Sequence, residues 1–162
     1  LSNYIKAVKE LGDDYRLVLL GKDYGVLNEY RKINPEIIHI DFIPAPDYLY
    51  FTAHAYIGIV TYEPTTLNCA YCAPNKIYEY GRYSLPMLAN DIPGLIYTIG
   101  YANAGVIVDE KSIESIKEGI LEIDRNHVLY SQNARRFYDD TDNVATIEKI
   151  LEVAMENKKY NI

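Results

Sequence analysis

Residues 74–94 have the sequence PNKIYEYGRYSLPMLANDIPG, and this stretch decides the fold class. A short helix is predicted at 75–80, capped by Gly81, because glycine readily adopts the backbone angles that end a helix. The apolar run at 85–89 has the length of a strand, and turn-forming residues follow it at 90–94. A helix followed directly by a strand is one unit of an alternating α/β chain.

The same alternation extends in both directions from this stretch. Residues 17–20 form an unbroken apolar run closed by Gly21, which predicts a strand buried on both faces, as in a parallel sheet. The complete order predicts an α/β fold with a Rossmann-like, doubly wound parallel sheet flanked by helices. The other predicted strands are 37–40, 56–60 and 105–108, and the other predicted helices are 4–11, 26–33, 47–53, 112–123, 126–138 and 141–154. On the last helix the residues expected to face the core are Val144, Ile147, Ile150, Leu151 and Ala154.

The composition fits a single globular domain over residues 1–162, with 49% hydrophobic and 24% charged residues. Acidic residues outnumber basic ones by 23 to 16, which argues against a nucleic-acid partner because such proteins normally carry a basic face. No apolar run is long enough to cross a membrane as a helix. The chain opens with Leu1 rather than Met, just before a predicted helix, so we expect further residues upstream.

Two cysteines, Cys69 and Cys72, raise the question of redox or metal chemistry. One pair cannot form a disulfide scaffold, so a reduced, cytoplasmic protein is predicted. A redox motif should open a helix directly after a strand, whereas this pair lies in a predicted loop. A zinc site needs about four ligands, and the three histidines are scattered along the chain. We therefore assign no metal ligand.

The loops after the strands are the expected place for a site, because doubly wound sheets bind ligands beyond the carboxyl ends of their strands. The loop at 61–74 is the longest, and it leads into the helix at 75–80. Free amides near Lys76 and Ile77, with the helix dipole and the Lys76 charge, favour an anion at this helix tip. Glu79 lies one turn further on, where its carboxylate suits the hydroxyls of a ribose. This is the arrangement of a bound nucleotide; an ordinary connecting helix with solvated side chains is the alternative.

The same residues resemble a known family. The motif P-N-K-hydrophobic-x-E-Y, then an L-P-hydrophobic strand and a D-x-P-G turn, resembles the C-terminal, donor-binding domain of GT-B glycosyltransferases of the GT4-like class (glycosyl transferases group 1). The runs at 17–21, 40–43, 54–60 and 104–108 fit the same domain in their order and spacing. The resemblance covers nearly the whole chain.

The resemblance implies a role for each matching residue. Glu79 would hold the ribose of a nucleotide-sugar donor, and the amides around Asn75, Lys76 and Ile77 would hold its diphosphate. Lys76 and Glu63 are the catalytic candidates. The remaining binding candidates are Asp41, Phe42, Ile43 and Pro44 at the base, Gly21 close to the nucleotide, and Tyr62 with Glu63 near the sugar.

The chain departs from the family pattern in two places. Many members carry a second glutamate eight residues before the ribose-binding one, but Tyr71 stands there, so Glu63 is the candidate substitute. The family's first strand, with its glycine turn and basic residue, and its acceptor-binding N-terminal domain have no counterpart in the sequence. Either the strands ending at Leu20 and Val60 pair directly, or the missing strand lies upstream.

The resemblance implies an enzyme that transfers a hexosyl unit from a nucleotide-diphosphate sugar, such as a UDP- or GDP-hexose, to an acceptor glycan or lipid-linked sugar in polysaccharide biosynthesis. No metal cofactor would be required, because the helix tip and Lys76 would stabilise the leaving diphosphate. The acceptor would bind the missing domain, through which the full enzyme could associate peripherally with a membrane, and the chain alone would be inactive. One alternative is a non-catalytic nucleotide-binding or regulatory α/β domain. Another is an interaction domain that binds a partner through a surface rich in its 17 tyrosines.

Overall fold

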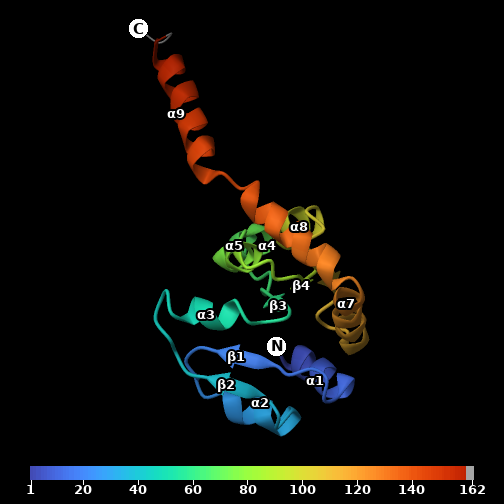
Figure 1. Ribbon diagram of the computed structural model, residues 1–162. Helices are drawn as coiled ribbons and strands as arrows, with labels where there is room; N and C mark the ends of the chain where they lie inside the picture. The colour runs from blue at the N-terminus through green and yellow to red at the C-terminus, as the bar shows by residue number, and fades with distance from the viewer. Residues whose placement is uncertain (160–162) are drawn as a thin grey trace.

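The computed structural model describes residues 1–159 and shows an alternation of strands and helices (Figure 1). The strands are β1 (Val18–Leu20), β2 (Ile38–Ile40), β3 (Gly58–Val60), β4 (Met87–Asn90) and β5 (Gly105–Val108). The helices are α1 (Ser2–Leu11), α2 (Leu27–Ile33), α3 (Tyr48–Thr52), α4 (Leu67–Tyr71), α5 (Asn75–Arg82), α6 (Pro93–Leu95), the π-helical turn η1 (Ile96–Gly100), α7 (Ile113–Arg125), α8 (His127–Asp139) and α9 (Asn143–Lys159). Every strand pair is parallel, so the predicted fold class is confirmed.

Helices cover both faces of the sheet β3-β4-β5. Leu88 and Val108 pack on one face with the apolar sides of α1 and α7, while Met87 and Ala89 pack on the other with α5, η1 and α8. Gly119 allows α7 to lie close to the strands, because a Cβ there would stand 2.5 Å from a methyl group of Val108. The two apolar clusters make this sheet the middle layer of the molecule.

The strands are divided between two hydrogen-bonded sheets, β1-β2 and β3-β4-β5. Within residues 1–159 no backbone hydrogen bond joins β1 to β3, so the direct pairing considered for the strands ending at Leu20 and Val60 does not form. In Figure 1 the N-terminus lies between the two sheets. Leu1 lines one cavity with Glu63, which follows β3, and another with Gly21, which follows β1.

The prediction that residues 17–20 are buried on both faces is wrong. Leu17 and Leu19 pack into the core near α1 and α2, whereas Val18 is 49% exposed and Leu20 is 37% exposed. Ile38, which pairs with Val18, is exposed as well. The core therefore contacts one face of β1-β2, and alternate side chains on the other face meet solvent.

Several short helices differ from the prediction. Helix α5 continues through Gly81, which was expected to end it, and ends at Arg82 with Tyr83 as its C-cap. Gly81 serves packing instead, because a Cβ there would lie 2.9 Å from the carbonyl oxygen of Ala134 on α8. Helix α4 lies inside the loop predicted as irregular, and α6 with η1 connects β4 to β5. Helices this short carry too few apolar repeats to be recognised from periodicity.

Helix α9 is present, but its apolar side is not buried. Ile147 is 57% exposed and Ile150 is 62% exposed, so the expected core contacts of this helix are wrong. The other three residues expected to face inward, Val144, Leu151 and Ala154, are exposed too. In Figure 1 the helix extends away from the rest of the chain. Periodicity identifies the apolar side of a helix but not whether the same chain covers it.

Candidate functional site

The predicted site residues follow the carboxyl ends of three strands. Gly21 comes directly after β1, residues 41–44 come after β2, and Tyr62 and Glu63 come after β3. Helix α5, with Glu79 on it, ends the connection from β3 to β4. Carboxyl ends of parallel strands share one edge of a sheet, which is where ligands bind in this fold class.

Glu79 is turned toward the segment that follows β2. Its carboxylate atom Oε1 accepts a 2.6 Å hydrogen bond from the Tyr48 hydroxyl, at the start of α3. Both side chains are half-buried, so the carboxylate does not point into the core. The hydrogen bond to Glu79 raises the pKa of Tyr48, because a phenolate there would lose the bond and face a negative charge.

Other tyrosines surround the same carboxylate. Burial raises the pKa of Tyr80 to about 12, and the nearby Glu79, Tyr62 and Tyr48 add to the shift. Burial also raises the pKa of Tyr62, with smaller contributions from two cysteine thiols and from Glu79. Glu79 therefore lies among tyrosine rings at a partly solvent-exposed position, where its charge is less screened than on an open surface.

The tip of α5 has the features expected of an anion site only in part. The amide of Ile77 donates to the carbonyl of Pro74 at 3.1 Å, so it is already satisfied, and the Ile77 side chain is fully buried as an anchor. The amides of Asn75 and Lys76 donate to no group among residues 1–159, and both side chains are exposed. These two residues are the ones positioned to meet an anion.

Tyr62 is held by a residue that sequence reasoning assigned to a turn. Asn90, 2% exposed at the end of β4, accepts a hydrogen bond from the Tyr62 amide at 3.1 Å and donates one to the Tyr62 carbonyl at 2.8 Å. This pair of bonds fixes the start of the loop that carries Glu63. The signal that could have identified Asn90 is a polar residue directly after an apolar strand.

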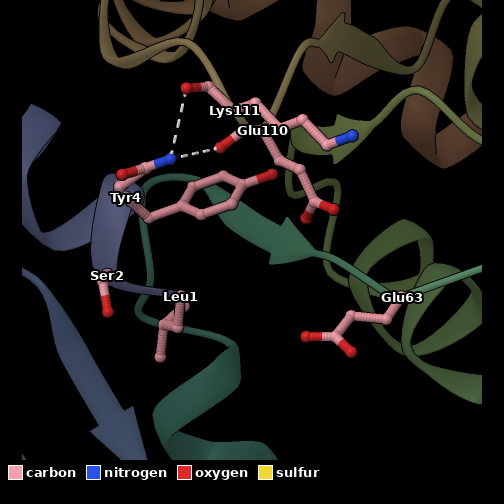
Figure 2. Close-up of a pocket in the computed structure, with 7 residues that line it drawn as sticks. Leu1, Ser2, Tyr4, Glu63, Glu110 and Lys111 are labelled. Atoms are coloured by element: carbon pink, nitrogen blue, oxygen red, sulfur yellow. Dashed lines mark hydrogen bonds between the residues drawn. The ribbon is translucent and has the colours of Figure 1, made fainter.

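Glu63 lines a cavity of about 230 Å³ together with the first turn of α1 and the segment after β5. Figure 2 shows the carboxylates of Glu63 and Glu110 and the ring of Tyr4 around the same space. Thr61 donates a 2.7 Å hydrogen bond to Glu110, and Asn3 donates to the Glu110 carbonyl at 2.9 Å. These bonds hold α1 and the ends of β3 and β5 together at this edge.

Tyr4 adds a buried hydroxyl to that cavity. It is 1% exposed, and its hydroxyl has no hydrogen-bond partner among the described residues. Burial raises the pKa of Tyr4 to about 12, so it is a neutral donor at ordinary pH. Sequence reasoning missed both Tyr4 and Glu110, although Glu110 follows β5 as other candidates follow their strands.

Gly21 and the segment after β2 are linked to each other. Gly21 has a φ of 139°, donates to the Ile40 carbonyl at 3.0 Å, and its own carbonyl lies 2.8 Å from the His39 ring nitrogen Nε2. Beyond β2 the Asp41 carboxylate accepts from the Phe42 amide, and Phe42 is 67% exposed. Ile43 is half-buried and Pro44 is exposed.

The structure therefore brings the candidates together in separate groups. Tyr62 lies near Glu79, Glu63 shares a cavity with Glu110, and Gly21 contacts His39. Within the described chain, no hydrogen bond or ion pair joins Glu79 to Gly21, Glu63 or Lys76. Residues 41–44 connect to Glu79 along the chain, through Tyr48.

The possible metal ligands and redox-active thiols of residues 1–159 belong to histidine, cysteine, aspartate and glutamate side chains. No group of three or more histidine, cysteine, aspartate or glutamate side chains in this range is placed to hold a metal ion. Cys69, within α4, and Cys72, at the C-cap of α4, are free thiols, and the Cys72 thiol lies 3.3 Å from the Cys69 carbonyl. Over the same range, no helix combines the length and the apolar character that a membrane crossing requires.

The solved structures that share the fold include WaaG and sucrose-phosphate synthase. WaaG, a glycosyltransferase involved in lipopolysaccharide biosynthesis, superimposes with a TM-score of 0.66 at 19% identity over 94% of this chain and 41% of its own. Sucrose-phosphate synthase from Thermosynechococcus elongatus gives a TM-score of 0.70 at 15% identity over 99% of this chain and 42% of its own. No protein-family profile and no curated protein sequence matches the chain.

The likeness establishes the fold. The chain has the Rossmann-like architecture of the C-terminal half of the GT-B fold, as its sequence resemblance implied. It spans about two fifths of the length of each structure that it matches.

Proposed function

We propose that the chain is the donor-binding domain of a glycosyltransferase that moves a hexosyl unit from a nucleotide-diphosphate sugar to an acceptor sugar. The observation that carries the proposal is the setting of Glu79 within a glycosyltransferase fold. Its carboxylate is half-buried at the carboxyl side of the strands and is oriented by Tyr48. A carboxylate in such a place accepts hydrogen bonds from the two hydroxyls of a ribose.

The diphosphate of the donor is assigned to the tip of α5. The amides of Asn75 and Lys76 and the ammonium group of Lys76 lie at the positive end of the helix dipole. Negative charge builds up on the diphosphate as the bond to the sugar breaks, and these groups stabilise it. Lys76 is therefore proposed to lower the activation barrier of sugar transfer by stabilising the departing diphosphate.

The hexosyl unit is assigned to the cavity around Glu63. Sugars present many hydroxyl donors, and Glu63 with Glu110 offers carboxylate oxygens that accept them. The buried Tyr4 hydroxyl adds a donor. Many family members contact the sugar through a second glutamate, at the position where this chain has Tyr71. Glu63, Glu110 and Tyr4 are together proposed to make those contacts here.

The acceptor is assigned to polypeptide outside this chain. WaaG and sucrose-phosphate synthase are each more than twice as long as the part of them that matches this chain. The acceptor glycan or lipid-linked sugar, and any group that activates it, would belong to the remainder. The isolated chain is expected to bind nucleotide without transferring sugar.

The test is a calorimetric titration of the chain, and of the longest polypeptide that contains it, with UDP, GDP and CMP. At least one nucleotide is expected to bind. Glu79→Ala should weaken that binding by about 1.5–3 kcal/mol, because hydrogen bonds to a charged group are lost. The matched control is Glu118→Ala, an exposed glutamate on α7.

Two results would refute the proposal. One is a folded polypeptide that binds none of the three nucleotides, and the other is an unchanged dissociation constant in Glu79→Ala. Tight nucleotide binding by a full-length polypeptide that transfers no sugar would favour a regulatory nucleotide-binding domain instead.

A further inference from the structure

A single hydrogen bond connects the segment after β2 to the carboxylate proposed to bind ribose. Tyr48 and Glu79 are 31 residues apart in sequence, and the hydroxyl-to-carboxylate distance is 2.6 Å. That is the length expected for a strong bond to a charged acceptor. Since both side chains are half-buried, water competes for the bond less than it would on an open surface.

The geometry leaves the carboxylate free to bind a ligand. Tyr48 engages Oε1, while Oε2 accepts no hydrogen bond from residues 1–159. Each carboxylate oxygen has two lone pairs, so two further donors can be accommodated. A free glutamate samples many rotamers, and fixing one of them in advance lowers the entropy that binding must lose.

Other nearby tyrosines do not make this contact. Burial raises the pKa of Tyr62 and Tyr80, and the nearby Glu79 adds to both shifts, but the described residues include no hydrogen bond from either tyrosine to Glu79. Tyr50, on the same helix as Tyr48, is 72% exposed, and its hydroxyl makes no hydrogen bond to Glu79 among the described residues. The hydroxyl of Tyr48 is therefore the group that holds the carboxylate.

We propose that Tyr48 is a positioning residue that holds Glu79 in the rotamer that accepts the ribose 2′,3′-diol, and so makes the site selective for nucleotides with both hydroxyls. This inference rests on the proposed function. Tyr48 also follows the segment 41–44, which is assigned to the base, within a few residues. The same helix α3 thus connects base recognition to ribose recognition.

The test compares the better-binding nucleotide, UDP or GDP, with its 2′,3′-dideoxy form in four proteins: wild type, Tyr48→Phe, Glu79→Gln and the control Tyr50→Phe. Wild type and Tyr50→Phe are expected to prefer the diol at least tenfold. Tyr48→Phe should reduce that preference several-fold, while its affinity for the dideoxy nucleotide changes by less than twofold. Glu79→Gln, which keeps the shape of the side chain, should reduce the preference as well.

The outcomes separate the two proposals. If wild type binds neither nucleotide, the proposed function fails and this inference fails with it. If wild type prefers the diol but Tyr48→Phe weakens both nucleotides equally or changes neither, Tyr48 has a general structural role or none, and this inference alone is overturned. Should Tyr48→Phe not fold, an unchanged diol preference in Glu79→Gln would overturn it.

Discussion

Asn90 shows how one buried amide can organise a site. Where the chain leaves β3, the Asn90 side chain accepts a hydrogen bond from the Tyr62 amide and donates one to the Tyr62 carbonyl. A carboxamide can do this because it carries a donor and an acceptor side by side, as a backbone peptide does. The position of Glu63 therefore depends on a side chain from the neighbouring strand.

Replacing Asn90 with alanine should destabilise the fold. The change leaves the amide and carbonyl of Tyr62 without their partners, and we expect the free energy of unfolding to fall by about 2–4 kcal/mol. Urea denaturation followed by circular dichroism measures it, with the exposed Asn68→Ala as the control. A loss below about 0.5 kcal/mol would show that water replaces the side chain without cost.

At this scale the sequence predicts which residues follow the strands, but not which of them meet. Glu79 and Glu63 could be selected because their positions come from local spacing and from the family motif. That Tyr4 and Glu110 line one cavity could not be predicted, because more than 100 residues separate them and they meet through the contact of the first turn of α1 with the segment after β5. Contacts between distant segments have no local signal.

Helix α5 depends on the absence of a side chain at Gly81. Alanine there would add a Cβ 2.9 Å from a backbone carbonyl of α8, which cannot move aside as a flexible side chain can. The overpacking cost of about 1–3 kcal/mol should exceed the gain in helix propensity of up to about 1 kcal/mol. A lower melting temperature for Gly81→Ala is therefore expected.

The control for this element is Gly100→Ala, where the added Cβ would meet its nearest atom at an ordinary 3.5 Å. Gly100→Ala should melt at or above the wild-type temperature. Equal melting temperatures for the two variants would contradict the close approach of α5 and α8.

Helix α9 should contribute little to stability on its own. Ile147→Ala is expected to change the free energy of unfolding by less than about 0.5 kcal/mol, because the side chain is already 57% exposed. Ile116→Ala on α7, where the side chain is fully buried, should cost about 2–5 kcal/mol. Chemical denaturation of both variants measures the contrast, and a large loss in Ile147→Ala would mean that α9 packs against the body.

Elements were predictable where their pattern is long or their residues are distinctive. The strand at 105–108 has the predicted limits, and the helix capped by Ser112 begins as predicted, although it ends at Arg125 rather than at residue 123. An apolar run and a capping side chain act locally, so they can be recognised from the sequence. The burial of β1 and α9 was predicted wrongly. Whether an apolar face is covered depends on the arrangement of the whole chain rather than on the segment itself.

The molecule as a whole should lose stability in alkali. Burial raises the pKa of Tyr4 and Tyr80 to about 12, and a hydrogen bond to Asp124 does the same for Tyr56. Unfolded tyrosines lose their protons near pH 10, so between pH 10 and 12 the folded state binds more protons than the unfolded state. The stabilisation is complete below pH 10 and should decline steadily above it.

Urea denaturation at pH 8, 10 and 11 measures this decline. Tyr80→Phe removes one of the responsible groups, so its free energy of unfolding should fall less steeply above pH 10. Parallel curves for Tyr80→Phe and wild type would show that Tyr80 titrates normally in the folded chain.

The divided sheet determines how the native chain opens. Strand β4 has a hydrogen-bonded neighbour on each side and is fully buried, whereas β1 pairs with β2 alone among residues 1–159. Amide protons of β4 should thus exchange with solvent only in the fully unfolded chain, and those of β1 in a smaller, more frequent opening. In that partly opened state the edge of β3 offers free backbone donors and acceptors, and a passing extended polypeptide could add to it as a strand.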